Sequence, residues 1–118
     1  MSYMLLIVEP LGQREARTEA EGHEAYESMV RFGKGLQEQG LLLAMESLKS
    51  HADAARVTVR GGKAQVLDGP FAEAKEMIGG FFLLNCKTRE EALAIARECP
   101  AAQWCTVEVR SLAPCYEI

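Results

Sequence analysis

Short apolar runs, alternating or continuous, predict the strands of this chain. Gly61-Gly62 separates two alternating runs, and paired glycines at such a point are typical of a two-residue hairpin, whose turn needs positive φ. Asp68-Gly69-Pro70 predicts a further turn. The predicted strands cover residues 3–8, 41–48, 57–60, 63–67, 81–86 and 104–112.

Two stretches have the signals of helices. Thr18 and Glu21 fit a capping box, and Gly40 supplies a left-handed terminator for the helix that follows. Gly33 falls on the apolar stripe of this helix, where a missing side chain lets it lie close to a sheet.

The second helix has its own capping box, Thr88 and Glu91, and ends before Pro100. A single helical turn is also predicted over residues 72–77.

The order of elements is β-α-β-hairpin-β-α-β, which predicts an α+β fold of the ferredoxin-like, split βαβ kind with an inserted β-hairpin. Residues 1–118 are expected to form a single domain. Two helices cover only one face of such a sheet, yet both alternating sets of residues 3–8 are apolar. Leaving about five such side chains in water forgoes on the order of 10 kcal/mol. We therefore expect a two-fold homodimer with its sheets face to face, or else a segment 41–80 that folds back over the second face.

Composition excludes several classes of partner. The 118 residues include 13 Lys and Arg against 17 Asp and Glu, with no basic cluster, so nucleic acid is not an expected ligand. Apolar runs of about five residues are far shorter than the ~20 that span a bilayer, and the start lacks the pattern of a signal peptide. A cytoplasmic protein with reduced cysteines is expected, and the cysteine spacing fits neither a zinc knuckle nor a redox pair.

Candidate chemistry gathers in two places. The stretch 68–76 is the densest in polar residues; Asp68 either takes part in chemistry or caps a helical turn, and Glu73, Lys75 and Glu76 either bind a substrate or form a solvated cluster. His23 lies on the stripe of the first helix, so it is expected to point towards the sheet or its rim and to serve as a general base, or else to be hydrogen-bonded at the helix start. His51, in a polar loop, is interpreted as a surface residue.

Residues 67–82, LDGPFAEAKEMIGGFF, are similar to the signature of the YCII-related family, specifically its DGPF branch. Residues 3–7 and 106–110 extend this resemblance over nearly the whole chain. It implies a dimeric α+β barrel in which two ferredoxin-like sheets enclose a cavity. It also implies a catalytic pair of a histidine on the first helix and a nearby aspartate, here His23 and Asp68. Phe71, Glu73, Lys75 and Glu76 match the motif and become candidate substrate-binding residues.

Two functional hypotheses follow. The first is a cofactor-independent enzyme that acts on a small organic molecule by proton transfer, with His23 as base, Asp68 as its partner and Lys75 as an anchor for an anion. No metal-ligand spacing, phosphate-binding loop, haem ligand or nucleotide motif is present, so no metal or cofactor is expected. The second is a non-catalytic dimer that binds a small ligand or a protein, such as the extracytoplasmic-function sigma factors whose genes lie near those of similar proteins.

Overall fold

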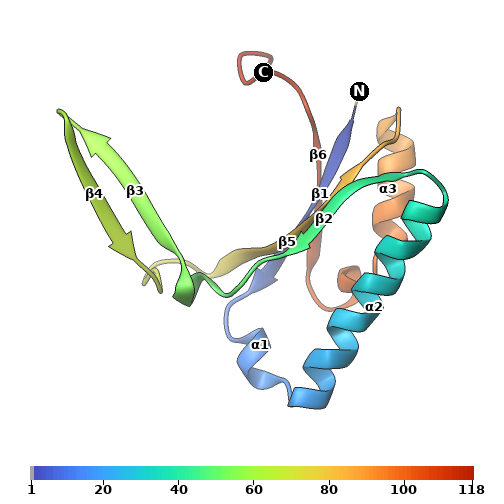
Figure 1. The fold of residues 1–118 in the computed structure, drawn as a ribbon, viewed down its shortest axis with the longest axis horizontal. Coiled ribbons are helices and arrows are strands. Elements are labelled where there is room, and N and C mark those ends of the chain that lie inside the picture. The colour runs from blue at the N-terminus through green and yellow to red at the C-terminus, as the bar shows by residue number, and fades with distance from the viewer. Residues whose placement is uncertain (1) are drawn as a thin grey trace.

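A four-stranded antiparallel sheet forms the centre of the protein, in the order β2-β5-β1-β6. The computed structural model describes residues 2–118. Helices α2 and α3 lie on the same side of the sheet (Figure 1). This is the predicted ferredoxin-like α+β topology. The sheet strands are β1 (Tyr3–Pro10), β2 (Leu42–Ser47), β5 (Glu76–Leu84) and β6 (Thr106–Ser111), and the helices are α1 (Gln13–Ala16), α2 (Glu19–Glu38) and α3 (Arg89–Glu98).

Both predicted helix starts are confirmed. At the start of α2 the Thr18 hydroxyl accepts the N–H of Glu21 (3.1 Å), and the Glu21 carboxylate accepts the N–H of Thr18 (2.8 Å). At the start of α3 the Thr88 hydroxyl accepts the N–H of Glu91 (3.1 Å) but donates its own proton to the Glu91 carboxylate (3.2 Å). At the start of α3, therefore, Thr88 and Glu91 are joined by a hydrogen bond between their side chains. Of the two backbone N–H groups that a capping box satisfies, only that of Glu91 is bonded within residues 2–118.

Gly33 brings α2 close to the sheet, as the sequence predicts. A Cβ at this position would meet the sulfur of Met45 and would lie 3.4 Å from the ring of Phe82. Beneath this contact, Leu5 and Leu84 are completely buried. The helix-covered face of the sheet is therefore the core of the chain.

The opposite face of the sheet is apolar and uncovered along its two central strands, β1 and β5, whereas β6 places Thr106, Glu108 and Arg110 on it. Along β1 the side chains alternate between buried and partly exposed, and the partly exposed ones belong to this face. We call this surface the open face; it comprises Met4, Leu6, Val8, Phe81 and Leu83. The sequence prediction of a second apolar face is confirmed.

The middle of the chain does not cover the open face, so the alternative in which segment 41–80 folds back is wrong. Strands β3 (Ala55–Arg60) and β4 (Lys63–Asp68) form a separate hairpin in which every residue is exposed. The hairpin extends away from the sheet (Figure 1). As a result the radius of gyration is 16.1 Å, against about 13.5 Å for a compact chain of this length.

The helical turn predicted over residues 72–77 is absent. Only the N–H of Ala74 makes a local turn bond, to the carbonyl of Phe71 (3.1 Å). Glu76 and Met77 belong instead to β5, where they pair with Pro10 and Glu9. Pairing across the sheet thus overrides the local helical tendency.

Three short helical segments were not predicted: α1, η1 (His51–Asp53) and η2 (Pro100–Gln103). None of the helices among residues 2–118 is both long and apolar enough to cross a membrane.

Candidate functional site

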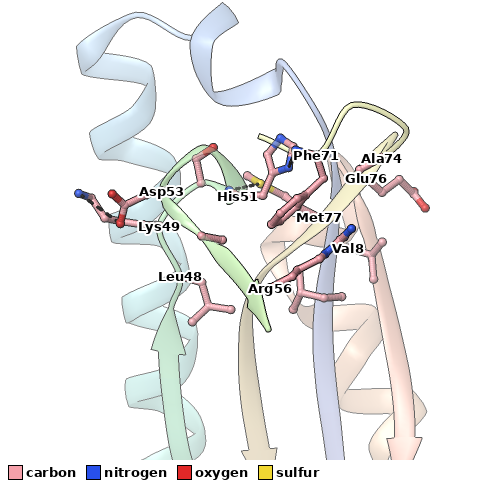
Figure 2. A pocket seen from close by; sticks show the side chains of 13 residues that line it. Val8, Leu48, Lys49, His51, Asp53, Arg56, Phe71, Ala74, Glu76 and Met77 are labelled. Atoms are coloured by element: carbon pink, nitrogen blue, oxygen red, sulfur yellow. Dashed lines mark hydrogen bonds and ion pairs between the residues drawn. The ribbon is translucent and has the colours of Figure 1, made fainter. Parts of the chain in front are cut away.

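A hollow of about 600 Å³ lies where the open face meets the base of the hairpin. We call it the open-face cavity. Val8, Leu48 and Ile78 give it an apolar floor, and Lys49, His51, Arg56 and Glu76 contribute polar groups. Figure 2 shows His51, Phe71 and Arg56 close together, with Lys49 beside Asp53 on one side of them and Glu76 on the other.

The Asp-Gly-Pro-Phe turn builds one wall of this cavity by holding η1 in place. The N–H of Gly69 donates to the carbonyl of Ala54 (2.8 Å), and a Cβ at Gly69 would meet the carbonyl oxygen of His51. Only glycine allows this approach. The turn thus has a structural function, which is to position His51.

Phe71 is the buried centre of this arrangement, with 6% of the residue exposed. The guanidinium carbon of Arg56 lies 3.7 Å from the centroid of its ring, and the imidazole of His51 is tilted against the same ring with centroids 5.7 Å apart. A cation over an aromatic face is stabilised by the quadrupole of the ring. Phe71 therefore orients two functional groups at once, as Figure 2 shows.

Two hydrogen bonds fix His51. Its backbone N–H donates to the sulfur of Met77 (3.3 Å), and its ring Nδ1 accepts the N–H of Phe71 (3.4 Å). Because Nδ1 is the acceptor, the proton of the neutral ring is on Nε2. The imidazole can therefore donate a hydrogen bond from Nε2.

The charges around the cavity are of both signs. Lys49 lies 3.9 Å from Asp53, whereas Arg56 and Glu76 have no ion pair among the described residues. A free guanidinium binds carboxylates and phosphates in a bidentate, forked geometry. The arrangement suits a small anionic ligand.

The predicted pair His23 and Asp68 is not brought together within one chain. The side chain of His23 is 77% exposed, and its Nε2 lies 4.0 Å from a carboxylate oxygen of Glu19 in the same helix. Asp68 is exposed at the end of β4, and the start of α2 lies well away from that strand end (Figure 1). Neither residue lines the open-face cavity.

The prediction that His23 points towards the sheet is wrong. The inward-facing stripe of α2 runs through Gly22, Met29 and Gly33. One residue along a helix is a rotation of about 100°, so His23 faces solvent.

The other predicted site residues divide into two groups. Phe71 and Glu76 line the open-face cavity, whereas Glu73 and Lys75 are exposed and do not. Sequence reasoning missed His51, Lys49 and Arg56. Little in the sequence indicated these residues, because each lies in a polar or exposed segment. His51 and Arg56 reach Phe71 only because η1 packs on the turn at Gly69.

Fold and cavity together define a small α+β protein of ferredoxin-like topology with a ligand-sized hollow against its uncovered sheet face. The chain belongs to the YCII-related family, whose model matches residues 1–115. An uncharacterised protein of Rhizobium meliloti (strain 1021) is 37% identical over 105 residues, which are 84% of this chain and 85% of that relative.

The fold is shared with known structures, one of which has a bound ligand. It is the 5-chloro-2-hydroxyhydroquinone dehydrochlorinase of Burkholderia phenoliruptrix AC1100, in complex with 2,5-dihydroxybenzoquinone. The alignment covers 96% of this chain and 94% of that one, with a TM-score of 0.55 and 12% identity. At this identity the likeness concerns the fold.

Proposed function

We propose that this protein is a cofactor-independent enzyme that acts on a small organic molecule by proton transfer in the open-face cavity. The observation that carries the proposal is the imidazole of His51, whose Nδ1 accepts the N–H of Phe71 (3.4 Å) and whose Nε2–H is thereby available to a ligand. Arg56, held on the same phenylalanine, places a positive charge beside it. A donor and a cation next to an apolar floor are suited to stabilise negative charge that develops on a substrate oxygen.

The chemistry assigns one role to each group. Arg56 holds an anionic substituent. The carboxylate of Glu76, which has no ion pair among the described residues, takes a proton from a carbon of the substrate. The electron pair of the broken C–H bond forms a C=C bond to the adjacent carbonyl carbon, and the π pair of that carbonyl moves to its oxygen, where His51 donates its Nε2–H. Return of the proton to another carbon completes an isomerisation, and departure of an anion completes an elimination.

The dehydrochlorinase that shares the fold supports this class of reaction by analogy. Its complex holds a dihydroxybenzoquinone, which is a small oxygenated ring. A ring of that size fits a hollow of about 600 Å³.

We also propose that a second copy of the chain covers the open face. Five apolar side chains of β1 and β5 remain partly exposed, and a contiguous apolar surface of this kind is typical of an interaction site. Two open faces related by a two-fold axis bury one another and close the cavity against water. Sedimentation velocity at micromolar concentration should give a dimer mass, and a monomer at every concentration would contradict this part of the proposal.

The enzyme hypothesis is tested with 5-chloro-2-hydroxyhydroquinone and related hydroxylated rings as probes, with product detected by chromatography. His51→Gln should lower kcat/KM at least 100-fold, because a donor to a developing oxyanion is worth that much. Arg56→Gln should act mainly on KM.

His23→Ala and Asp68→Asn are the matched controls and should leave turnover within about twofold. If these two variants lost turnover and His51→Gln retained it, the chemistry would belong to the sequence-predicted pair, and our assignment would be wrong.

The non-catalytic alternative has one observation in its favour: the Asp-Gly-Pro-Phe turn is fully accounted for by its structural contacts with η1 and Arg56. A regulatory dimer that binds a small ligand or a protein would need the same cavity without turnover. Saturable binding of a probe with no product would support this second function.

A further inference from the structure

A second hollow, of about 530 Å³, lies on the other side of the sheet, between α2 and strands β1 and β5. We call it the helix-side cavity. Met29, Phe82 and Trp104 contribute to its apolar walls, and Glu9 and Arg17 contribute charges. It shares no lining residue with the open-face cavity. The proposed function therefore does not use it.

Glu9 is a buried carboxylate with one oxygen uncommitted. Its side chain is 7% exposed, and Arg14 donates to Oε1 from Nε (2.9 Å) and from a terminal nitrogen (2.5 Å). Among the described residues no donor reaches Oε2, and no fully enclosed side-chain oxygen lacks a partner, so Oε2 is open to the cavity. A ligand with a hydroxyl or amine group can therefore donate a hydrogen bond to this carboxylate oxygen.

The Glu9–Arg14 pair is itself held in place. Arg14 also donates to the backbone carbonyls of Leu48 (2.8 Å) and Gly79 (3.3 Å). A Cβ at Gly79 would meet the Glu9 carboxylate, so glycine is needed here to admit it. These contacts explain why the ion pair is stable, but they do not use Oε2.

Arg17 supplies the second polar contact of the helix-side cavity. Its guanidinium lies 5.7 Å from the centroid of the Trp104 ring, and Gln13 anchors that segment by donating to the Trp104 carbonyl (2.6 Å). Arg14 already compensates Glu9, so the charge of Arg17 is available to an anion. Aromatic and thioether side chains beside it suit a flat ring.

We propose that the helix-side cavity binds a small aromatic acid that carries a hydroxyl group. The ring lies against Met29, Phe82 and Trp104, the hydroxyl donates to Oε2 of Glu9, and the carboxylate binds Arg17. The site is built entirely from one chain. It is separate from the site of the proposed proton transfer.

The test uses 4-hydroxybenzoate and benzoate as probes and the fluorescence of Trp104, the one tryptophan of the chain, as the readout. Trp104 lines the helix-side cavity and not the open-face cavity, so quenching distinguishes binding at the first from binding at the second. We expect saturable quenching, with 4-hydroxybenzoate bound about tenfold more tightly than benzoate, since a hydrogen bond to a charged acceptor has this value. Arg17→Gln should weaken both probes about tenfold.

Two controls separate this site from others. Arg31→Gln removes an exposed arginine of α2 that pairs with Glu24 (2.9 Å), and it should change nothing. Arg56→Gln alters the open-face cavity and should also leave the quenching unchanged. If Arg56→Gln abolished binding and Arg17→Gln did not, the probe would occupy the open-face cavity and this inference would be overturned, while the proposed function would stand.

The role of Glu9 is tested by Glu9→Gln, which should reduce the preference for 4-hydroxybenzoate over benzoate to about twofold or less. Circular dichroism establishes whether this variant folds. If it does not fold, the comparison of the two probes on the unmodified protein decides: equal affinities overturn the assignment of Glu9. Absence of saturable quenching at 10 mM probe would overturn the site as a whole.

Discussion

The two faces of the central sheet are both apolar, yet they are used differently. On the helix-covered face Leu5, Phe82 and Leu84 are at most 2% exposed, whereas Leu6 and Phe81, their neighbours in the chain, remain partly exposed on the open face. The hydrophobic effect acts equally on both sets. The difference shows that one chain contains a complete core on one side of the sheet only.

The two cavities differ in the same way. On the helix side the carboxylate of Glu9 is buried and its charge is compensated by Arg14. At the open face the ionic groups lie at the rim, and Arg56 is stabilised by the ring of Phe71. A pocket inside the monomer is therefore polarised by fixed buried groups, and the pocket at the open face acquires a low dielectric only when something covers it.

The largest effect is expected from a charge on the open face. Leu6→Glu should weaken self-association by at least 1,000-fold, because a two-fold axis places both introduced carboxylates in one apolar interface, at a cost of several kcal/mol. The free energy of unfolding of the monomer should change little. Sedimentation velocity measures the first quantity and urea denaturation of dilute protein the second. Unchanged association would show that the open face is not the interface.

The neighbouring residue on the other face gives the matched comparison. Leu5→Ala should lower the free energy of unfolding by about 2–5 kcal/mol, since it leaves a cavity among completely buried side chains. Leu6→Ala should cost less at concentrations where the protein is monomeric, because that side chain is partly exposed there. Urea denaturation of both variants measures the difference. Equal losses in dilute solution would mean that the two faces are equally packed within one chain.

The reactivity of Cys105 provides an independent measure of the environment on the helix side of the sheet, with a smaller expected effect. Burial raises the pKa of the Cys105 thiol from 9.0 to about 11, and the carboxylate of Glu9 acts in the same direction. Since the thiolate is the reactive form, alkylation of Cys105 at pH 8 should be roughly 100-fold slower than for a thiol with the ordinary pKa. Mass spectrometry after timed iodoacetamide treatment gives the rate, with exposed Cys115 as the internal control.

The same shift has a consequence for stability. Because folding raises the pKa of Cys105, the folded state favours the protonated thiol. This contribution is complete below about pH 9 and is lost as the pH rises towards 11. Equal alkylation rates for Cys105 and Cys115 would contradict the burial of this thiol.

Local signals in the sequence predicted most of the fold. The capping residues Thr18 and Thr88, the Gly61-Gly62 turn with φ values of 56° and 77°, and Gly40 with φ of 72° all lie where predicted. Each acts within a few residues along the chain, so the composition of a short window contains the information. The failure at residues 72–77 has the opposite cause, because β5 there pairs with residues of β1 that are distant in the chain.

The candidate site could not be predicted in this way. Phe71 and Glu76 were identified because they belong to a recognisable motif, whereas His51 and Arg56 were not, because their partner in each case is Phe71, 20 and 15 positions further along the chain. The orientation of His23 was predicted wrongly because the apolar stripe of the helix was placed one residue off. One residue corresponds to a rotation of about 100°, which turns the side chain away from the sheet.

By itself, the sequence determined the order of the main strands and helices, the caps of α2 and α3, the family and the apolar residues on both sheet faces. Only the tertiary structure decided which face is covered, where the hairpin points and which side chains share a cavity. The reason is physical: turns, caps and periodicity depend on interactions between near neighbours in the chain. The position of His51 over Phe71 and the burial of Glu9 beside Gly79 depend on close contacts between segments that only the folded chain brings together.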